Sequence, residues 1–335
     1  MGEKSLPRLS AFWATGCLVL LLGNGCGDPE AGPVMEGTLV SSSALRGFLG
    51  GKGGLLTWVS QGQIKLLDFR GDNPEIKTLV EDLDSVNPLF SPDGTRLVYS
   101  QGNPNGPKFI FVKKLEASPA TKLATGDLGY WNFRNGEESI AYADWSDKDQ
   151  NGAGGSTYRQ KLKTGTVELE GSKETLHTRA MDAGPNATLG WLGQVYGQLV
   201  AYNVSARKEY PADKFFLLDG SAATHQTCNG SMAPDDSARI LVLAIPHDFM
   251  RIFSYQSSSD TFRETSRFTM PAGQLEWEFP EWSTHVEYFT TILRSTDLAN
   301  HLVIVKRTEG ASAPNLLEVL GGEQGATFSH LYVQP

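Results

Sequence analysis

One group of oxygen-bearing side chains has the spacing of a calcium loop. Asp147, Asp149 and Asn151 alternate along the chain and are followed by Gly152, which permits the sharp turn that such loops need. Tyr158 occupies the twelfth position, where an EF-hand has a bidentate Glu, so an ion would be held weakly. The pattern predicts a Ca²⁺ site between two strands; the alternative is a polar hairpin tip that needs no ion.

A second group combines nitrogen and sulfur ligands. His225, Cys228, His247 and His285 lie in the later part of the chain, and imidazole and thiolate bind zinc and other transition metals. Their spacing matches no common metal motif, since the chain has no His-x-His, no His-Glu-x-x-His and no closely spaced Cys pair. A transition-metal site is one interpretation. Histidines that satisfy backbone groups, beside a buried thiol, are the other.

A third group places aromatic rings beside carboxylates and amides. Trp131 and Trp277 lie near the starts of predicted strands, and Asn229, Glu276 and Glu278 are the polar neighbours in the same part of the pattern. Such combinations suit sugar rings or peptide segments, which offer both apolar faces and hydrogen-bonding groups. We expect a ligand site from these residues. The alternative is that the large rings fill the space between sheets.

The N-terminal residues have the layout of an export signal. Lys4 and Arg8 precede the apolar stretch 11–22, and small residues then lead to Cys26. This end resembles the lipobox of bacterial lipoproteins, in which the signal is cut just before a Cys that becomes diacylated, although the Leu of that pattern is displaced by one position. We expect residues 1–25 to be a signal peptide and Cys26 to be the lipid attachment site. An ordinary cleaved signal is the alternative.

The segment that follows predicts a spacer. Residues 26–54 are rich in Gly, Ser and Pro and show no sustained apolar period, which is typical of a flexible linker. With the signal removed and Cys26 acylated, Cys228 is the only remaining thiol. The mature chain therefore forms no internal disulfide, and its stability must come from packing.

The clearest internal repeat is a turn followed by a strand. Residues 91–94 read Ser-Pro-Asp-Gly, a tight turn in which Pro presets φ, Asp bonds the backbone ahead and Gly adopts a left-handed conformation. Residues 96–100 and 108–115 then have the composition of strands. The unit predicts one sheet of a larger, repeated structure.

Weaker copies of this unit recur at a regular interval. Their apolar anchors are about 48 residues apart on average, which is the period of a propeller blade; the anchors are Phe90, Phe133, Leu192, Met232, Trp282 and Phe328. The last copy ends after one strand, and the first strands of the domain, from residue 55, lack an inner partner. We therefore expect an all-β, six-bladed β-propeller over residues 55–335, closed by the C-terminal strand. The alternative is a pair of β-sandwiches.

The Ser-Pro-Asp-Gly unit resembles the repeat of TolB-like six-bladed propellers, and the resemblance covers roughly residues 55–335. That family's translocation protein has an additional α/β domain before its propeller, and we expect this chain to lack it because the spacer is short. Some oligogalacturonate lyases are also propellers, with a His-bound metal. The resemblance thus leaves room for a metal-dependent polysaccharide lyase.

Charge narrows the range of partners. The chain has 29 Lys and Arg against 38 Asp and Glu, a formal charge of −9, and no basic run that could neutralise a phosphate backbone. A nucleic acid partner is therefore not expected. We expect an extracytoplasmic, membrane-anchored envelope lipoprotein whose propeller is a non-catalytic binding or scaffolding module for protein or glycan ligands. The alternative function is the metal-dependent lyase.

Overall fold

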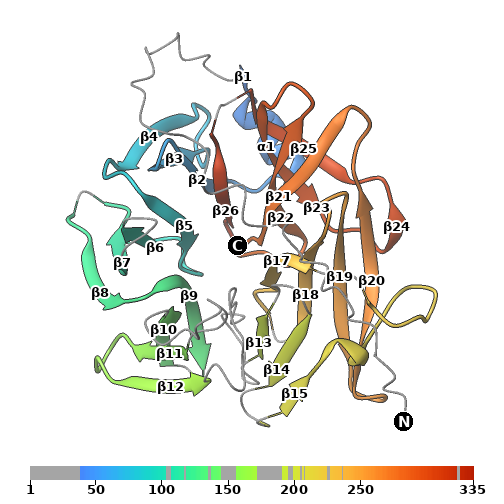
Figure 1. Cartoon of the computed structure of the whole chain (residues 1–335). Helices are drawn as coiled ribbons and strands as arrows, with labels where there is room; N and C mark the ends of the chain where they lie inside the picture. The colour runs from blue at the N-terminus through green and yellow to red at the C-terminus, as the bar shows by residue number, and fades with distance from the viewer. Residues whose placement is uncertain are drawn as a thin grey trace, which may run out of the picture. The chain divides into compact units, whose positions relative to one another are not determined.

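Short apolar segments fold into strands throughout the described part of the chain (Figure 1). The computed structural model describes residues 38–102, 107–116, 118–134, 137–144, 156–171, 191–194, 199–203, 206, 208–224, 227–235, 237–322 and 325–335. In these ranges α1 (Ser42–Phe48) is the one α-helix, and a 3-10 helix covers Ala212–Lys214. No helix in the same ranges is long and apolar enough to cross a membrane.

The strands form six sheets, which we number in chain order. Sheet 1 consists of β2 (Gly54–Ser60), β3 (Gln63–Asp68), β4 (Glu75–Val80) and β26 (Thr327–Val333). Sheet 2 consists of β5 (Ser85–Phe90), β6 (Arg96–Gly102), β7 (Lys108–Lys114) and β8 (Thr121–Thr125). Sheet 3 consists of β9 (Asp127–Arg134), β10 (Glu137–Asp144), β11 (Ser156–Lys161) and β12 (Val167–Gly171). Sheet 4 consists of β13 (Trp191–Gln194), β14 (Val200–Asn203) and β15 (Lys208–Tyr210).

The last two sheets have additional edge strands. Sheet 5 consists of β17 (Thr227–Met232), β18 (Arg239–Ala244), β19 (Phe249–Gln256) and β20 (Thr261–Thr269), with β16 (Phe215–Phe216) and β24 (Gly310–Ser312) added in parallel to β20. Sheet 6 consists of β21 (Gln274–Trp282), β22 (Tyr288–Ser295), β23 (Asn300–Lys306) and β25 (Asn315–Gly321), with β1 (Thr38–Leu39) on its outer edge. The outer edges of these two sheets are therefore covered by other segments of the same chain.

Five of the six sheets have four or more strands, which is the composition of a propeller blade. Sheet 4 has three described strands, and residues 172–190 before it lie outside the described ranges. The all-β propeller expected from the sequence is confirmed. The described ranges contain five complete blades rather than the six expected, because no fourth strand of sheet 4 falls within them.

The C-terminal strand closes the propeller as the sequence predicts. β26 pairs antiparallel with β2, from Gly54 opposite Val333 to Val59 opposite Thr327. Thr290 on sheet 6 donates a hydrogen bond to the carbonyl of Ser329 at 2.8 Å. Since β26 bonds to both its own sheet and sheet 6, the two ends of the described chain hold the ring together.

The predicted spacer needs a correction, because residues 38–54 are ordered. Ser41 caps α1 by accepting a hydrogen bond from the backbone N–H of Ala44, and Leu45 and Leu49 lie one helical turn apart and are fully buried between sheets 1 and 6. Arg46 forms an ion pair with Asp72 of sheet 1 at 2.6 Å. We call residues 38–49 the clasp. The sequence analysis missed the helix because the clasp is short and rich in Ser and Gly, and Leu45 and Leu49 are its fully buried apolar residues.

The Ser-Pro-Asp-Gly turn has the predicted conformation. The N–H of Gly94 donates to the carbonyl of Ser91 at 2.8 Å, and Asp93 accepts a hydrogen bond from the N–H of Thr95 at 3.0 Å. Gly94 has a φ of 67°, and an added Cβ would lie 2.5 Å from the ring of Tyr332. Glycine is thus required there for both conformation and space.

The apolar core consists of clusters between neighbouring sheets. Separate clusters fill the contacts of sheets 1 and 6, 1 and 2, 2 and 3, 4 and 5, and 5 and 6. The largest fully buried rings include Trp58, Trp277 and Trp282. Because each cluster fixes one sheet against the next, the innermost strands are held at constant positions around the axis.

Candidate functional site

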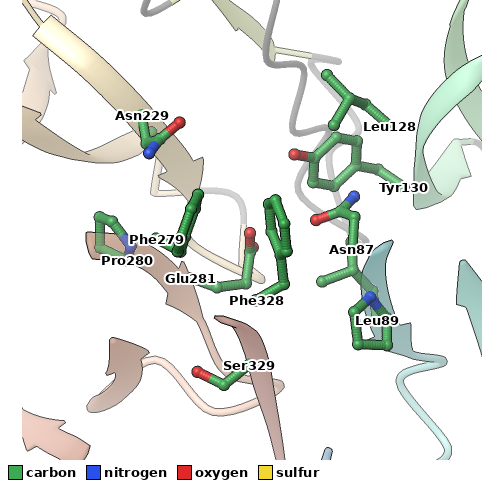
Figure 2. A pocket seen from close by; sticks show the side chains of 12 residues that line it. Asn87, Leu89, Leu128, Tyr130, Asn229, Phe279, Pro280, Glu281, Phe328 and Ser329 are labelled. Carbon is green, nitrogen blue, oxygen red and sulfur yellow. The ribbon is translucent and has the colours of Figure 1, made fainter. Parts of the chain in front are cut away.

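The innermost strands of five sheets line one open pocket (Figure 2). Its empty space is about 450 Å³ when the open solvent at its entrance is included, and its lining residues come from β5, β9, β17, β21 and β26. We call it the mouth pocket; it is lined by Asn87, Pro88, Leu89, Leu128, Tyr130, Asn229, Gly230, Phe279, Pro280, Glu281, Phe328 and Ser329. On β9 and β26 these residues lie toward the start of the strand, on β5 and β17 they lie near its middle, and on β21 they lie toward its end. We call the end at which the innermost strands start the mouth end of the propeller.

A bulge in each of these strands shapes the pocket. On β5 the pairing passes from Val86 opposite Ser100 to Leu89 opposite Val98, which leaves one extra residue on the inner strand. The same kind of register shift occurs on β9, β17, β21 and β26. Four lining residues adopt left-handed conformations there, with φ between 41° and 53°; they are Asn87, Leu128, Phe279 and Phe328. Bulges re-aim side chains, so the repeated feature turns one ring of residues toward the axis.

Two buried polar groups of the mouth pocket lack a hydrogen-bond partner among the described residues. The Nδ2 of Asn87 is one and the Oγ of Ser329 is the other, and the two residues are 5% and 2% exposed. Both side chains line the pocket (Figure 2). Buried polar groups are nearly always paired in folded proteins, so these two indicate that a ligand or water completes the site.

Glu281 contributes a carboxylate that is positioned from the adjacent sheet. Ser231 on β17 donates a hydrogen bond to its Oε1 at 2.6 Å, and the Oγ of Ser231 also accepts one from the N–H of Trp282 at 2.8 Å. Figure 2 shows the carboxylate of Glu281 and the hydroxyl of Tyr130 among the side chains that converge on the pocket. The acid is therefore held in place before any ligand arrives.

Two phenyl rings form the apolar wall of the mouth pocket. The ring centroids of Phe279 and Phe328 are 4.3 Å apart, at an interplanar angle of 36°. Each ring is only partly buried and is carried by a bulge residue of its strand. The pocket thus combines aromatic faces, a carboxylate and unpaired amide and hydroxyl groups.

A second, inner pocket lies further along the same strands and shares Leu89, Tyr130 and Glu281 with the mouth pocket. Trp282 also lines it, and the indole Nε1 of that residue is buried without a partner in the described ranges. His330 lines it as well, and the N–H of Phe90 donates to the Nδ1 of that ring at 3.0 Å. Burial lowers the pKa of His330 to about 3, so the ring is neutral at neutral pH.

The residues predicted to bind a ligand are distributed between these pockets and the core. Asn229 lines the mouth pocket, and Trp131 lines the inner pocket, where its Nε1 donates to the carbonyl of Leu89 at 2.9 Å. Trp277 is fully buried in the cluster between sheets 5 and 6. For Trp277 the packing interpretation is correct, because its strand directs the ring toward the adjacent sheet.

Glu276 and Glu278 belong to a charged cluster at the start of β21. Arg294 lies 2.6 Å from the Oε1 of Glu276 and 3.4 Å from the Oε1 of Glu278, and the Nδ1 of His247 lies 3.6 Å from the Oε2 of Glu276. Burial raises the pKa of Glu278, and Arg294 opposes this effect. Burial lowers the pKa of His247. Neither carboxylate lines the two pockets, so we assign this cluster to the contact between sheets 5 and 6.

The predicted transition-metal ligands are not brought together where the structure describes them. His247 contacts the start of β21, whereas His285 follows its end and packs against Tyr288, so the two imidazoles lie at opposite ends of a nine-residue strand. The side chain of Cys228 and the whole of His225 lie outside the described ranges. In those ranges no three His, Cys, Asp or Glu side chains are placed to hold a metal ion.

The predicted calcium loop and lipid attachment site also lie outside the described residues. Asp147, Asp149 and Asn151 belong to the segment that joins β10 and β11, which pair antiparallel, so the expected flanking strands are confirmed. Cys26 precedes the first described residue. Both sites remain predictions.

Several lining residues of the mouth pocket were not recognised from the sequence, namely Asn87, Phe279, Glu281, Phe328 and Ser329. One available signal was the pair of Pro residues at positions 88 and 280, which the structure places inside β5 and β21. Proline is tolerated within sheets mainly at edges and bulges, so these two prolines mark the places where the inner strands deviate.

Comparison with known proteins places the chain among β-propellers. No family model and no curated protein matches the sequence. Among solved structures, TolB from Acinetobacter baumannii is similar with a TM-score of 0.58 and 14% identity, over 83% of this chain and 66% of that one. A chain of the nidogen/laminin complex is similar with a TM-score of 0.51 and 8% identity, over 84% of this chain and 98% of that one. An oligogalacturonate lyase in complex with manganese gives a TM-score of 0.45 at 14% identity, over 75% of this chain and 70% of that one.

These likenesses concern the fold. The chain is a β-propeller protein with a TolB-like fold, and it spans just under two thirds of the length of the TolB structure. Identities of 14% and below do not carry ligands or partners from one protein to another.

Proposed function

We propose that the protein is a non-catalytic binding module whose ligand occupies the mouth pocket. The observation that carries this proposal is the pair of buried, unpartnered polar groups on Asn87 and Ser329, which line an open pocket built by five inner strands. Such groups cost free energy until a ligand or an ordered water satisfies them. The strained bulges around the pocket add support, since strain of this kind gathers at binding sites.

The proposal includes six blades and an extracytoplasmic location, with Cys26 as the lipid anchor. The lipobox-like sequence before Cys26 and the repeat interval of the blades support these parts. Thr38 begins β1 opposite Gly321, the last residue of β25, so the described chain begins at the mouth end. Residues 27–37 span at most about 40 Å when extended. An anchored propeller would therefore have a short tether.

Site-specific photo-crosslinking of the full chain tests the binding proposal. A photoreactive residue at Asn229, or in a second variant at Leu128, should form adducts in the intact envelope because both positions line the mouth pocket. Leu218 is a matched control, since it is exposed near the outer edge of sheet 5 and away from the pocket. Equal adducts from Leu218, or none from either mouth position, would contradict the proposal.

The anchor is tested separately. Cys26→Ser should abolish palmitate labelling and release the protein from the membrane fraction, while the propeller keeps its thermal stability. Labelling that persists in the variant would mean that the anchor is at another residue.

A further inference from the structure

We propose that the mouth pocket recognises a basic residue of an extended peptide, with the ammonium or guanidinium group against Glu281 and the rings of Phe279 and Phe328. This inference rests on the proposed binding function and specifies its ligand. Aromatic faces attract cations through the ring quadrupole, and a nearby carboxylate adds direct charge attraction. The three side chains line the same pocket, and their strands fix them there.

The charge of the surroundings favours a cation. Neither the mouth pocket nor the inner pocket has a Lys or Arg among its described lining residues. Acidic residues stand in the loops at the mouth end, namely Asp82 and Asp84 before β5, Asp248 between β18 and β19, and Asp297 between β22 and β23. A concave site with one sign of charge raises the local concentration of ligands of the opposite sign.

Three of the basic side chains toward this end are paired with acids. Lys108 lies 2.6 Å from Asp127, and Arg294 binds Glu276 and Glu278. Arg251 lies 3.3 Å from the buried Glu264. Since each of these cations is paired with an acid of its own, they do not offset the negative charge of the acidic residues in the loops at the mouth end.

The unpaired polar groups explain why a peptide fits better than an isolated cation. The Nδ2 of Asn87 is a donor and the Oγ of Ser329 can donate, so each requires an acceptor from the ligand. A basic residue within a peptide brings both parts, because its side chain ends in a cation and its backbone carries carbonyl oxygens. A neutral glycan supplies hydroxyls but no positive charge.

Binding of three matched probes to the full chain in detergent tests the inference. N-acetyl-lysine N-methylamide and its arginine analogue should bind at least about tenfold more tightly than the uncharged norleucine analogue of the same length. Added salt should weaken the two basic probes more than the neutral one. A neutral N-acetylglucosamine oligomer is the fourth probe and should not compete with them.

Two variants locate the effect. Glu281→Gln can still accept the hydrogen bond of Ser231 but loses its charge, and it should remove most of the preference for the basic probes. Phe328→Leu keeps apolar volume but removes one ring, and it should lower the same preference. Glu287→Gln is the control, because Glu287 is exposed in the turn after β21, at the opposite end of the propeller. Thermal melts of all variants confirm that they are folded.

Three results would overturn the inference. Equal binding of the norleucine probe would show that charge is not selected, and displacement by the glycan oligomer would identify a carbohydrate site instead. An undiminished preference in Glu281→Gln would place the cation elsewhere. Each of these results is compatible with crosslinks at Asn229 or Leu128, so the binding proposal would survive, whereas a lack of crosslinks at both positions would remove both proposals.

Discussion

His330 should make the stability of the propeller depend on pH. The ring is 6% exposed, and burial lowers its pKa from 6.5 to about 3, while a backbone hydrogen bond with Trp282 opposes the shift. Between these two values the unfolded chain binds a proton that the folded chain does not. Stability therefore rises with pH through this interval and is lost as the pH falls. At pH 5 the loss relative to pH 7 is about 2 kcal/mol from this residue.

The protonated ring would also break a contact between sheets. Its Nδ1 accepts the hydrogen bond from the N–H of Phe90, and β26 belongs to sheet 1 whereas Phe90 belongs to sheet 2. Once protonated, the Nδ1 becomes a donor and faces another donor. The acid-sensitive point is therefore in the strand that closes the ring.

The measurement is the free energy of unfolding in urea at pH 7 and pH 5. His330→Gln does not titrate, so it should lose about 2 kcal/mol less than the parent over this interval, whatever its stability at pH 7. If His330→Gln and the parent lose equal stability, the reasoning from the buried ring is refuted.

Further predictions concern a turn, the clasp and the calcium loop. Gly94→Ala should destabilise the protein by at least about 2 kcal/mol in thermal or urea unfolding, because the new Cβ meets a ring of β26. Gly165→Ala, with a similar φ but open space, should cost only about 1 kcal/mol; equal losses would remove the steric argument. Leu45→Ala should lower stability by about 2–4 kcal/mol, and an unchanged melting temperature would mean that the clasp contributes no core. Calcium should raise the melting temperature of the parent over that of Asp147→Ala/Asp149→Ala, and equal shifts would leave only a polar hairpin tip.

Local chemistry made part of the fold predictable. The turn at residues 91–94 is determined by Pro, Asp and Gly acting on their own backbone, so its conformation follows from composition alone. Closure was predictable from the repeat pattern. The last copy of the repeat has a first strand without the rest of a blade, and the first copy lacks an inner strand, so β26 and β2 complete one sheet. The turn depends on local residues alone, whereas the closure follows from matching two incomplete units at the two ends of the repeat.

The ligand site was less predictable because it depends on register. Whether a tryptophan near the start of an inner strand faces the axis or the adjacent sheet is decided by strand pairing, as Trp131 and Trp277 illustrate. The bulge at Phe328 arises between strands that are distant in sequence, whereas the bulge at Phe279 lies in a hairpin of consecutive strands, where Pro280 is a local signal. The clasp was missed for a related reason, since Leu45 and Leu49 become core residues only against sheets 1 and 6.

The position of β1 has a mechanical consequence. A force applied to the chain on its N-terminal side acts first on Thr38 and Leu39, at the outer edge of sheet 6. The force is then transmitted through α1 to β2. The strands that line the mouth pocket are not in the first part of this load path. The clasp should therefore yield first and release at most about 40 Å of chain, a first extension that force spectroscopy can measure. An attached protein under tension would lengthen its tether while the pocket kept its shape.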